Sequence, residues 1–118
     1  MGFCVALLHE YFTAINNRDY PGYIALFTQQ ERQVLTIGRF YSGYRSTQDS
    51  GELLADISTD SGTVATVTFT SHQNPADSVN HRESCTLWRI SLFLQPNGSG
   101  YLIGPPPPGY HASYADCP

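Results

Sequence analysis

Residues 84–94 read Ser-Cys-Thr-Leu-Trp-Arg-Ile-Ser-Leu-Phe-Leu, and they carry the strongest strand signal in the chain. Side chains of two kinds alternate along this stretch, and a period of two is typical of a β-strand with one packed face. One face is expected to hold Trp88, Ile90, Leu92 and Leu94, and the other Leu87, Arg89, Ser91 and Phe93. The sequence on both sides of this strand predicts the rest of a sheet.

Three further segments are predicted as strands: residues 50–59, 63–72 and 101–103. A turn at 59–62 joins the first two of these segments, and a polar connection at 73–83 leads to the strand 84–94. A turn at 96–100 then leads to residues 101–103. In the segment 63–72, Ala65, Val67 and Phe69 share one face, while the other face is rich in threonine. This distribution is typical of a sheet with one packed face. Together the segments predict a four-stranded, mainly antiparallel meander over about 50–104.

Three helices are predicted before the sheet, within about 3–45. The first covers 3–16, whose apolar residues recur at spacings of three and four as in an amphipathic helix. These residues are Phe3, Leu7, Leu8, Tyr11, Phe12 and Ile15. Asn17 is suited to the left-handed cap after it, and Asp19 can cap a second short helix with Pro21 in its first turn. A third helix is expected over about 29–42, with Val34, Ile37 and Tyr41 as its apolar members and Gly38 as a weak point.

Four consecutive prolines separate the sheet from the end of the chain. Residues 105–108 cannot donate ladder hydrogen bonds, so this segment is predicted to be extended and of polyproline type. It begins a tail over 105–118 that is expected to be too proline-rich for regular structure. Helices followed by a meander make an α+β plan. A chain of 118 residues is long enough for one domain and too short for two.

The composition excludes several classes of function. The net charge is −4, and the six basic residues are all arginine and scattered, so we expect no nucleic-acid binding. No apolar run approaches the length of a membrane span, so we expect no membrane insertion. The three cysteines and four histidines (His9, His72, His81 and His111) fit no zinc spacing, and we expect neither a metal nor a cofactor.

Two of the cysteines are predicted to form a disulfide. Cys117 follows the proline-rich segment, where a free thiol has little to do, and Cys85 begins the central strand. In the chain-entropy model such a bridge is worth about 3–4 kcal/mol. It would place the domain outside the reducing cytoplasm. Cys4 is then left over as a small apolar helix residue. The apolar start is too short for a signal peptide, so we expect the chain to be a fragment whose leader or anchor has been removed.

The stretch Tyr11-Phe12-Thr13-Ala14-Ile15-Asn16-Asn17-Arg18-Asp19-Tyr20 resembles the first helix of the nuclear transport factor 2-like superfamily, which includes SnoaL-type cyclases and ketosteroid isomerase. The later stretches Cys85–Ile90, Gly100–Ile103 and Tyr110–Tyr114 are similar to a narrower group of accessory domains. Those domains lie outside the membrane in high-GC Gram-positive bacteria, some of them attached to serine/threonine kinases. The resemblance implies a cone-like fold in which a curved sheet wraps three helices around a pocket.

Candidate pocket residues follow from the aromatic and charged side chains on these elements. Tyr11, Tyr23, Tyr41, Tyr44 and Trp88 could line a ligand cavity, or they could be core residues whose polar tips reach the surface. Asp56 is the best-placed carboxylate on a strand, with a rim or outer-face position as the alternative. Arg89 could meet an anionic ligand, or it could pair with Glu52 or Asp56 across the sheet.

Two functions of different class remain. The first is a non-catalytic, extracytoplasmic module that binds a small apolar ligand or a protein partner, or that forms a homodimer through the open face of its sheet. The second is a small SnoaL-like isomerase, cyclase or hydrolase, which the superfamily resemblance implies and which would need an acid or base in the pocket. We favour the module, because the sequence shows no acid–base constellation. A deep pocket with a buried, partnerless carboxylate or His would favour the enzyme. A pocket closed by Tyr and Trp side chains, beside a broad exposed threonine face, would favour the module.

Overall fold

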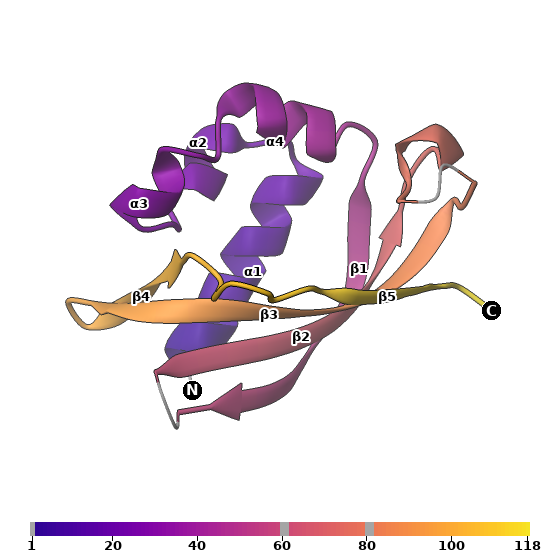
Figure 1. The fold of residues 1–118 in the computed structure, drawn as a ribbon. Coiled ribbons are helices and arrows are strands. Elements are labelled where there is room, and N and C mark those ends of the chain that lie inside the picture. The colour runs from indigo at the N-terminus through magenta and orange to yellow at the C-terminus, as the bar shows by residue number, and fades with distance from the viewer. Residues whose placement is uncertain (1, 60–61, 80–81) are drawn as a thin grey trace.

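The computed structural model describes residues 2–59, 62–79 and 82–118, with the backbone alone for residues 2–4. Within these ranges the fold is α+β, with four helices and an antiparallel sheet (Figure 1). The helices are α1 (Gly2–Asn16), α2 (Tyr20–Ile24), α3 (Gln29–Arg32) and α4 (Ile37–Gly43). The strands are β1 (Gln48–Ser58), β2 (Thr63–His72), β3 (Cys85–Asn97), β4 (Gly100–Gly104) and β5 (Ser113–Asp116).

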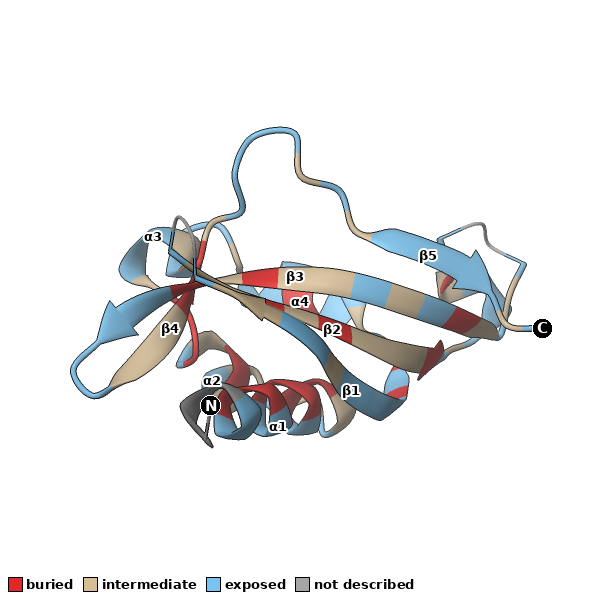
Figure 2. Cartoon of the chain, turned by 90° about the horizontal axis from the view of Figure 1, so that it is seen from below, coloured by how far each residue is buried: buried red, intermediate tan, exposed pale blue. Residues whose placement is uncertain are grey.

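The helices lie together over one face of the sheet, and the core fills the space between the two layers (Figure 1). α1 crosses this face and contributes most of the helical core, including Phe12 at 3% exposure and Ile15 at 1%. From the sheet, Ala65 and Val67 of β2 are fully buried. Figure 2 shows that β5 and much of β1, which lie at the margins of the sheet, are exposed.

The predicted meander is confirmed, with strands in the order β1-β2-β3-β4 and all neighbours antiparallel. β2 and β3 pair without interruption from Thr63 opposite Leu94 to His72 opposite Cys85. The faces of both strands are also as predicted: Leu92 and Leu94 are buried, whereas Leu87 and Arg89 are exposed on the outer face. The middle of the predicted 59–62 turn, Asp60 and Ser61, lies outside the described residues.

The third predicted helix is two short helices, α3 and α4, instead of one. Thr36 breaks the segment because its side chain accepts the Arg39 backbone N–H and so caps a new helix. The predicted apolar face was also wrong. Val34, Ile37 and Tyr41 are all exposed, and α4 instead buries Phe40 against the rings of Tyr20 and Tyr23.

The turn after α1 also differs in detail. Arg18, and not Asn17, takes the left-handed conformation, with φ 56°. Its guanidinium compensates by donating to the backbone carbonyls of Ile15 and Asn16 at the end of the helix. Asp19 caps α2 as predicted, accepting the Gly22 N–H.

The tail was predicted to lack regular structure, but its last residues form the strand β5. This strand pairs with β3 from Arg89 opposite Ser113 to Thr86 opposite Asp116, on the edge that β4 occupies further along. The proline run carries the chain past the gap between β4 and β5. In that gap the Tyr110 hydroxyl accepts the Ser91 N–H at 2.6 Å, which satisfies a β3 amide that no strand residue reaches.

Two irregularities bend β1 over the end of α1. Its register against β2 shifts between Ser50 and Leu53 and again between Leu54 and Asp56. Gly51, inside the first shift, has φ +65°, a conformation that other residues adopt only under strain. Such bulges increase the local bend and twist of a strand. The beginning of β1 is thereby directed toward the helical layer.

Cys85 and Cys117 lie in a disulfide, with Cα atoms 5.5 Å apart and a separation of 32 positions in sequence. The predicted pairing is therefore confirmed at the level of geometry. The bridge holds the end of β5 beside the start of β3, where the Cys117 N–H also donates to the Cys85 carbonyl. Across the three described ranges, no helix is long and apolar enough to span a membrane.

Candidate functional site

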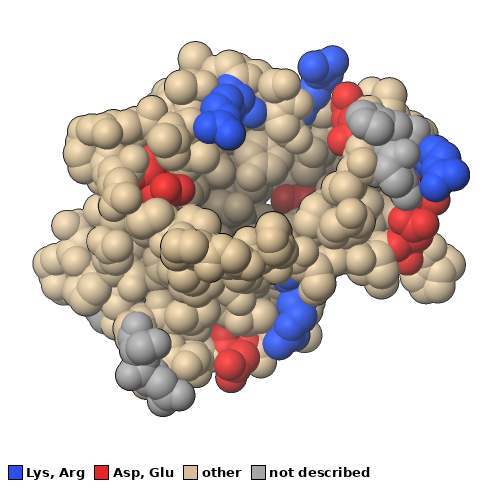
Figure 3. Space-filling view, viewed as in Figure 1, with Lys and Arg blue, Asp and Glu red and all other residues tan. Residues whose placement is uncertain are grey.

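A cavity of about 310 Å³ lies between the helical layer and the inner face of the sheet. α1, the end of α4, the start of β1, the end of β2 and the first half of β3 all contribute to its lining, and the connection 73–79 borders it. Figure 3 shows a hollow between the two layers, with acidic side-chain atoms in its depth. The lining residues are Tyr11, Ile15, Gly43, Tyr44, Thr47, Asp49, Phe69, Ser71, Gln73, Asp77, Ser78, Val79, Thr86, Trp88 and Ile90.

Asp49 is the buried carboxylate of this cavity. Its residue is only 7% exposed, and its Oδ1 is buried with no hydrogen-bond partner among the described residues. Burial raises the pKa of Asp49 to about 7, because the ionised form loses its hydration. Ser71 and Arg18 oppose this rise in pKa, and the negative charge of Glu52 adds to it. Asp49 is therefore a carboxyl group that can hold or release a proton near neutral pH.

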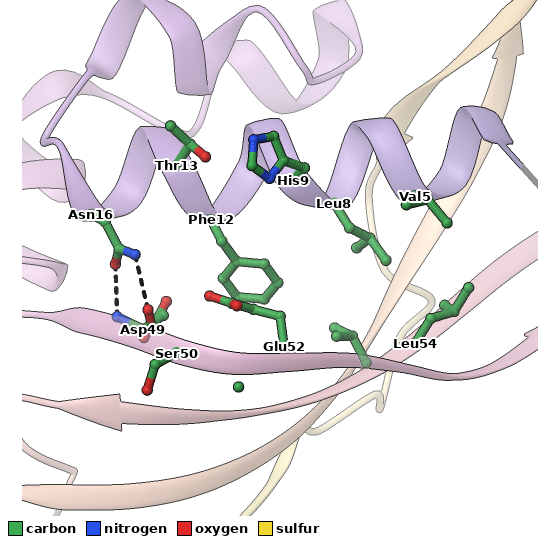
Figure 4. Close-up of a pocket in the computed structure, with 12 residues that line it drawn as sticks. Val5, Leu8, His9, Phe12, Thr13, Asn16, Asp49, Ser50, Glu52 and Leu54 are labelled. Carbon is green, nitrogen blue, oxygen red and sulfur yellow. Dashed lines mark hydrogen bonds between the residues drawn. The ribbon is translucent and has the colours of Figure 1, made fainter.

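The backbone of Asp49 is fixed by a side chain of α1. The Asn16 amide donates to the Asp49 carbonyl at 2.9 Å and accepts the Asp49 N–H at 2.7 Å, as the dashed lines in Figure 4 show. A neighbouring strand would satisfy these two backbone groups in a sheet, and here one amide side chain does so. The helix thus sets the position at which β1 begins and holds Asp49 at the cavity.

Three tyrosine hydroxyls gather near the carboxylate on the helical side. The Tyr23 and Tyr44 hydroxyl oxygens are 3.3 Å apart, and Tyr11 lies close enough to raise its own pKa through Tyr44. Burial is the largest cause of the raised pKa of all three groups. They are consequently neutral hydrogen-bond donors over the whole accessible pH range.

A second depression, a groove of about 510 Å³, runs between α1 and β1 (Figure 4). Leu8 and Phe12 point from the helix toward the strand and form its apolar floor. His9 and Glu52 are the exposed titratable groups along it. Asp49 lines both the groove and the cavity, so this one carboxylate marks the point where the two depressions meet.

Three of the seven predicted pocket residues, Tyr11, Tyr44 and Trp88, line the cavity. Tyr23 is not part of the lining and lies behind it, where its hydroxyl contacts that of Tyr44. Tyr41 lies on the exposed surface of α4, where its hydroxyl donates to the Arg18 carbonyl.

The two charged candidates lie outside the cavity. Asp56 is exposed on β1 opposite Thr66. Arg89 is exposed on the outer face opposite Thr68, with β2 between it and β1, so the predicted pairing of Arg89 with Glu52 or Asp56 has no direct route across the sheet.

Sequence reasoning passed over Asp49 because it lies near the start of a predicted strand, where carboxylates are usually solvated. One signal was available. Ser71 lies on the same face of β2 as Ala65, Val67 and Phe69, because side chains two positions apart share a face. The packed face of the strand therefore ends in a polar side chain. The cross-strand partner of Ser71 is Asp49. The sequence does not reveal this pairing, because the register between β1 and β2 shifts at Gly51.

The chain matches no protein-family model, no curated protein and no solved structure. Over the described ranges, no three His, Cys, Asp or Glu side chains are grouped as a metal ion would require. The function is therefore inferred from the cavity itself.

Proposed function

We propose that the chain is a ligand-binding module whose site is the cavity between the helices and the sheet. The observation that carries this proposal is the buried Asp49 Oδ1, which has no hydrogen-bond partner among the described residues. A buried polar atom without a partner costs about 1–3 kcal/mol, and native proteins keep few of them. A bound molecule that donates a hydrogen bond to this oxygen would remove the cost.

The walls of the cavity support a small and largely apolar occupant. Ile15, Phe69, Trp88 and Ile90 supply apolar surface from α1, β2 and β3. The Tyr11 and Tyr44 hydroxyls and the Asp49 carboxyl add polar groups, and further polar side chains of the lining are Thr47, Ser71, Gln73, Asp77, Ser78 and Thr86. Apolar surface combined with polar groups that fix orientation is typical of sites for small organic molecules.

The wider setting of the module is also part of the proposal. We propose that the helices on one face of the sheet and the two register shifts of β1 belong to a cone-like fold of the nuclear transport factor 2-like type. The Cys85–Cys117 bridge supports an extracytoplasmic location, because such bridges persist in oxidising compartments. We accordingly place the domain outside the cytoplasm, as an accessory or sensor unit.

Trp88 provides the assay, because it is the single tryptophan of the chain and lines the cavity. Its fluorescence is to be followed during titration with a panel of small apolar fragments, both neutral and charged, led by 2-phenylethanol. Gly43→Leu adds a side chain at the edge of the cavity, since Gly43 lies in the lining and a Cβ there meets nothing within 4 Å. Gly38→Leu is the matched control, in the same helix and equally unobstructed but outside this lining.

We expect a saturable change in fluorescence for the parent chain and for Gly38→Leu, and its loss in Gly43→Leu. The proposal fails if no fragment gives a saturable change, or if Gly43→Leu binds as the parent does.

A second function, acid–base catalysis in the same cavity, is favoured by the buried, partnerless Asp49 carboxylate, the feature that the sequence leads us to expect of an enzyme, and by its pKa of about 7. Such a carboxylate could accept a proton from carbon next to a carbonyl, while a tyrosine hydroxyl donates a hydrogen bond to the developing enolate oxygen. Exchange of the α-protons of cyclohexanone in deuterated buffer, followed by NMR, tests this function. Catalysis requires exchange above the buffer rate that Asp49→Asn removes and Asp56→Asn keeps; equal rates in all samples exclude it for this substrate class.

A further inference from the structure

We infer that the ligand carries a positively charged amino group, which binds against Asp49 between the aromatic side chains of the cavity. This inference rests on the proposed function and specifies the chemical class of the ligand. It depends on three features of the described residues: the signs of the charges around the cavity, the aromatic content of its walls, and the unpartnered carboxylate oxygen.

The charged residues in the described lining are both acidic. Asp49 and Asp77 line the cavity, and no arginine or histidine is among the described residues that do so. The chain has no lysine, as all six of its basic residues are arginine. Arg18 is the cation that acts on Asp49, but its guanidinium is engaged by the carbonyls of Ile15 and Asn16. Figure 3 likewise shows the basic side chains of this face on the outer surface, away from the hollow.

Aromatic rings surround the same space. Tyr11, Tyr44, Phe69 and Trp88 all contribute to the lining. The rings of Phe69 and Trp88 lie nearly parallel, with an interplanar angle of 12° and centroids 6.4 Å apart, on the inner face of the sheet. An ammonium group within about 6 Å of such a ring is attracted by the negative face of its π-system. Rings and carboxylates together are the two partners that an organic cation prefers.

Ligands of other charge fit less well. An anion would face two carboxylates without a basic partner in the lining, and its burial would be strongly unfavourable. A neutral ligand would leave the ionised Asp49 without a counter-charge. An ammonium group instead donates a charge-assisted hydrogen bond to Asp49 Oδ1, which otherwise has no donor among the described residues.

Amine binding should be coupled to the protonation of Asp49. A cation favours the ionised carboxylate, so binding at neutral pH releases a proton and strengthens as the pH rises through about 7. The other charged or titratable groups that act on Asp49 or border its two depressions are Arg18, Glu52, Asp77, His9, Tyr11 and Tyr44. The raised pKa values of Tyr11 and Tyr44 keep both hydroxyls neutral over this range.

The test compares three probes of similar shape and different charge: 2-phenylethylamine, 2-phenylethanol and phenylacetate. Calorimetry and Trp88 fluorescence measure their affinities for the parent chain, for Asp49→Asn and for the matched control Asp56→Asn. Asp56 is an exposed carboxylate on the same strand, and it is in neither lining. Both variants remove one negative charge, so a long-range effect of net charge would appear equally in the two.

We expect the amine to bind the parent chain and Asp56→Asn at least tenfold more tightly than the alcohol, and the anion to bind most weakly. Asp49→Asn should reduce the affinity for the amine by roughly 10- to 100-fold, the range for a lost hydrogen bond to a charged group. The affinity for the alcohol should change by less than about threefold, since the neutral ligand makes no ion pair. Heats measured in two buffers of different ionisation enthalpy should show proton release for the amine alone.

The outcomes separate this inference from the proposed function. If the alcohol binds as tightly as the amine, or if Asp49→Asn keeps the preference for the amine, the cationic ligand is refuted and the cavity remains a ligand site. If none of the three probes binds, both ideas fail. If Asp56→Asn also removes the tenfold preference for the amine over the alcohol, the preference arises from net charge and the inference is overturned as well.

Discussion

Replacing Asp49 by asparagine should make the stability of the protein less dependent on pH. The substitution keeps the size of the side chain and removes a carboxyl group that is 7% exposed and whose pKa is raised from 3.8 to about 7. A carboxyl group with a raised folded-state pKa binds its proton more tightly in the folded protein than in the unfolded chain. Its contribution to stability is therefore complete below about pH 4 and is lost as the pH rises through about 7.

The magnitude follows from the two pKa values. One pKa unit corresponds to about 1.4 kcal/mol, so between about pH 5 and about pH 8 the parent chain should lose about 2.5 kcal/mol relative to Asp49→Asn. For a domain of this size that difference corresponds to roughly 10 °C in melting temperature. Urea unfolding of both proteins across the pH range measures it, with Asp56→Asn as the exposed control. Parallel pH profiles for the parent and Asp49→Asn would refute the assignment of Asp49 as a buried, partly protonated carboxyl group.

Three further changes test the supports of the site. Asn16→Ala removes both hydrogen bonds to the Asp49 backbone and should lower the free energy of unfolding in urea by about 1–3 kcal/mol. The control Asn17→Ala, at an exposed neighbouring residue, should lower it little. Equal losses in the two variants would contradict the role given to the Asn16 amide. Reduction of the Cys85–Cys117 bridge should lower the free energy of unfolding by about 3–4 kcal/mol, and a Cys85→Ser/Cys117→Ser chain that is as stable as the parent would argue against it. Ile15→Ala, at 1% exposure, should cost about 2–5 kcal/mol, measured by thermal unfolding, and a cost near zero would mean that the core around α1 is wrongly described.

The elements that were predictable from sequence are those with a strong local pattern. α1 and the central strands β2 and β3 appear where their periods of 3.6 and 2 place them. Asp19 caps its helix as predicted, since a cap depends on residues that are adjacent in the chain. The disulfide was also predictable, because few other roles suit a cysteine after a proline run.

The errors occurred where distant contacts overrule a local pattern. Val34, Ile37 and Tyr41 have helical spacing, but Thr36 restarts the helix and turns Phe40 to the core instead. β5 follows a proline run that argues against a strand, yet the open edge of β3 supplies partners for it. Asp49 lies at the site because the β1–β2 register places it opposite Ser71. That register depends on a bulge that the composition of the sequence does not reveal.

The proline run beside β3 has a consequence for how the molecule behaves in a crowded solution. An uncovered strand margin can recruit strands from other molecules and so start aggregation. On this margin β4 and β5 cover the two ends of β3, and the Tyr110 hydroxyl occupies the Ser91 amide between them. The prolines that cross this gap cannot donate to an incoming strand. The outer edge of β4 is itself partly occupied, because the Ile103 N–H and carbonyl bond to the backbone of Leu26 and Thr28. Growth of the sheet on this side is thereby restricted to the rest of β4 and the four residues of β5, lengths too short to hold a foreign strand firmly.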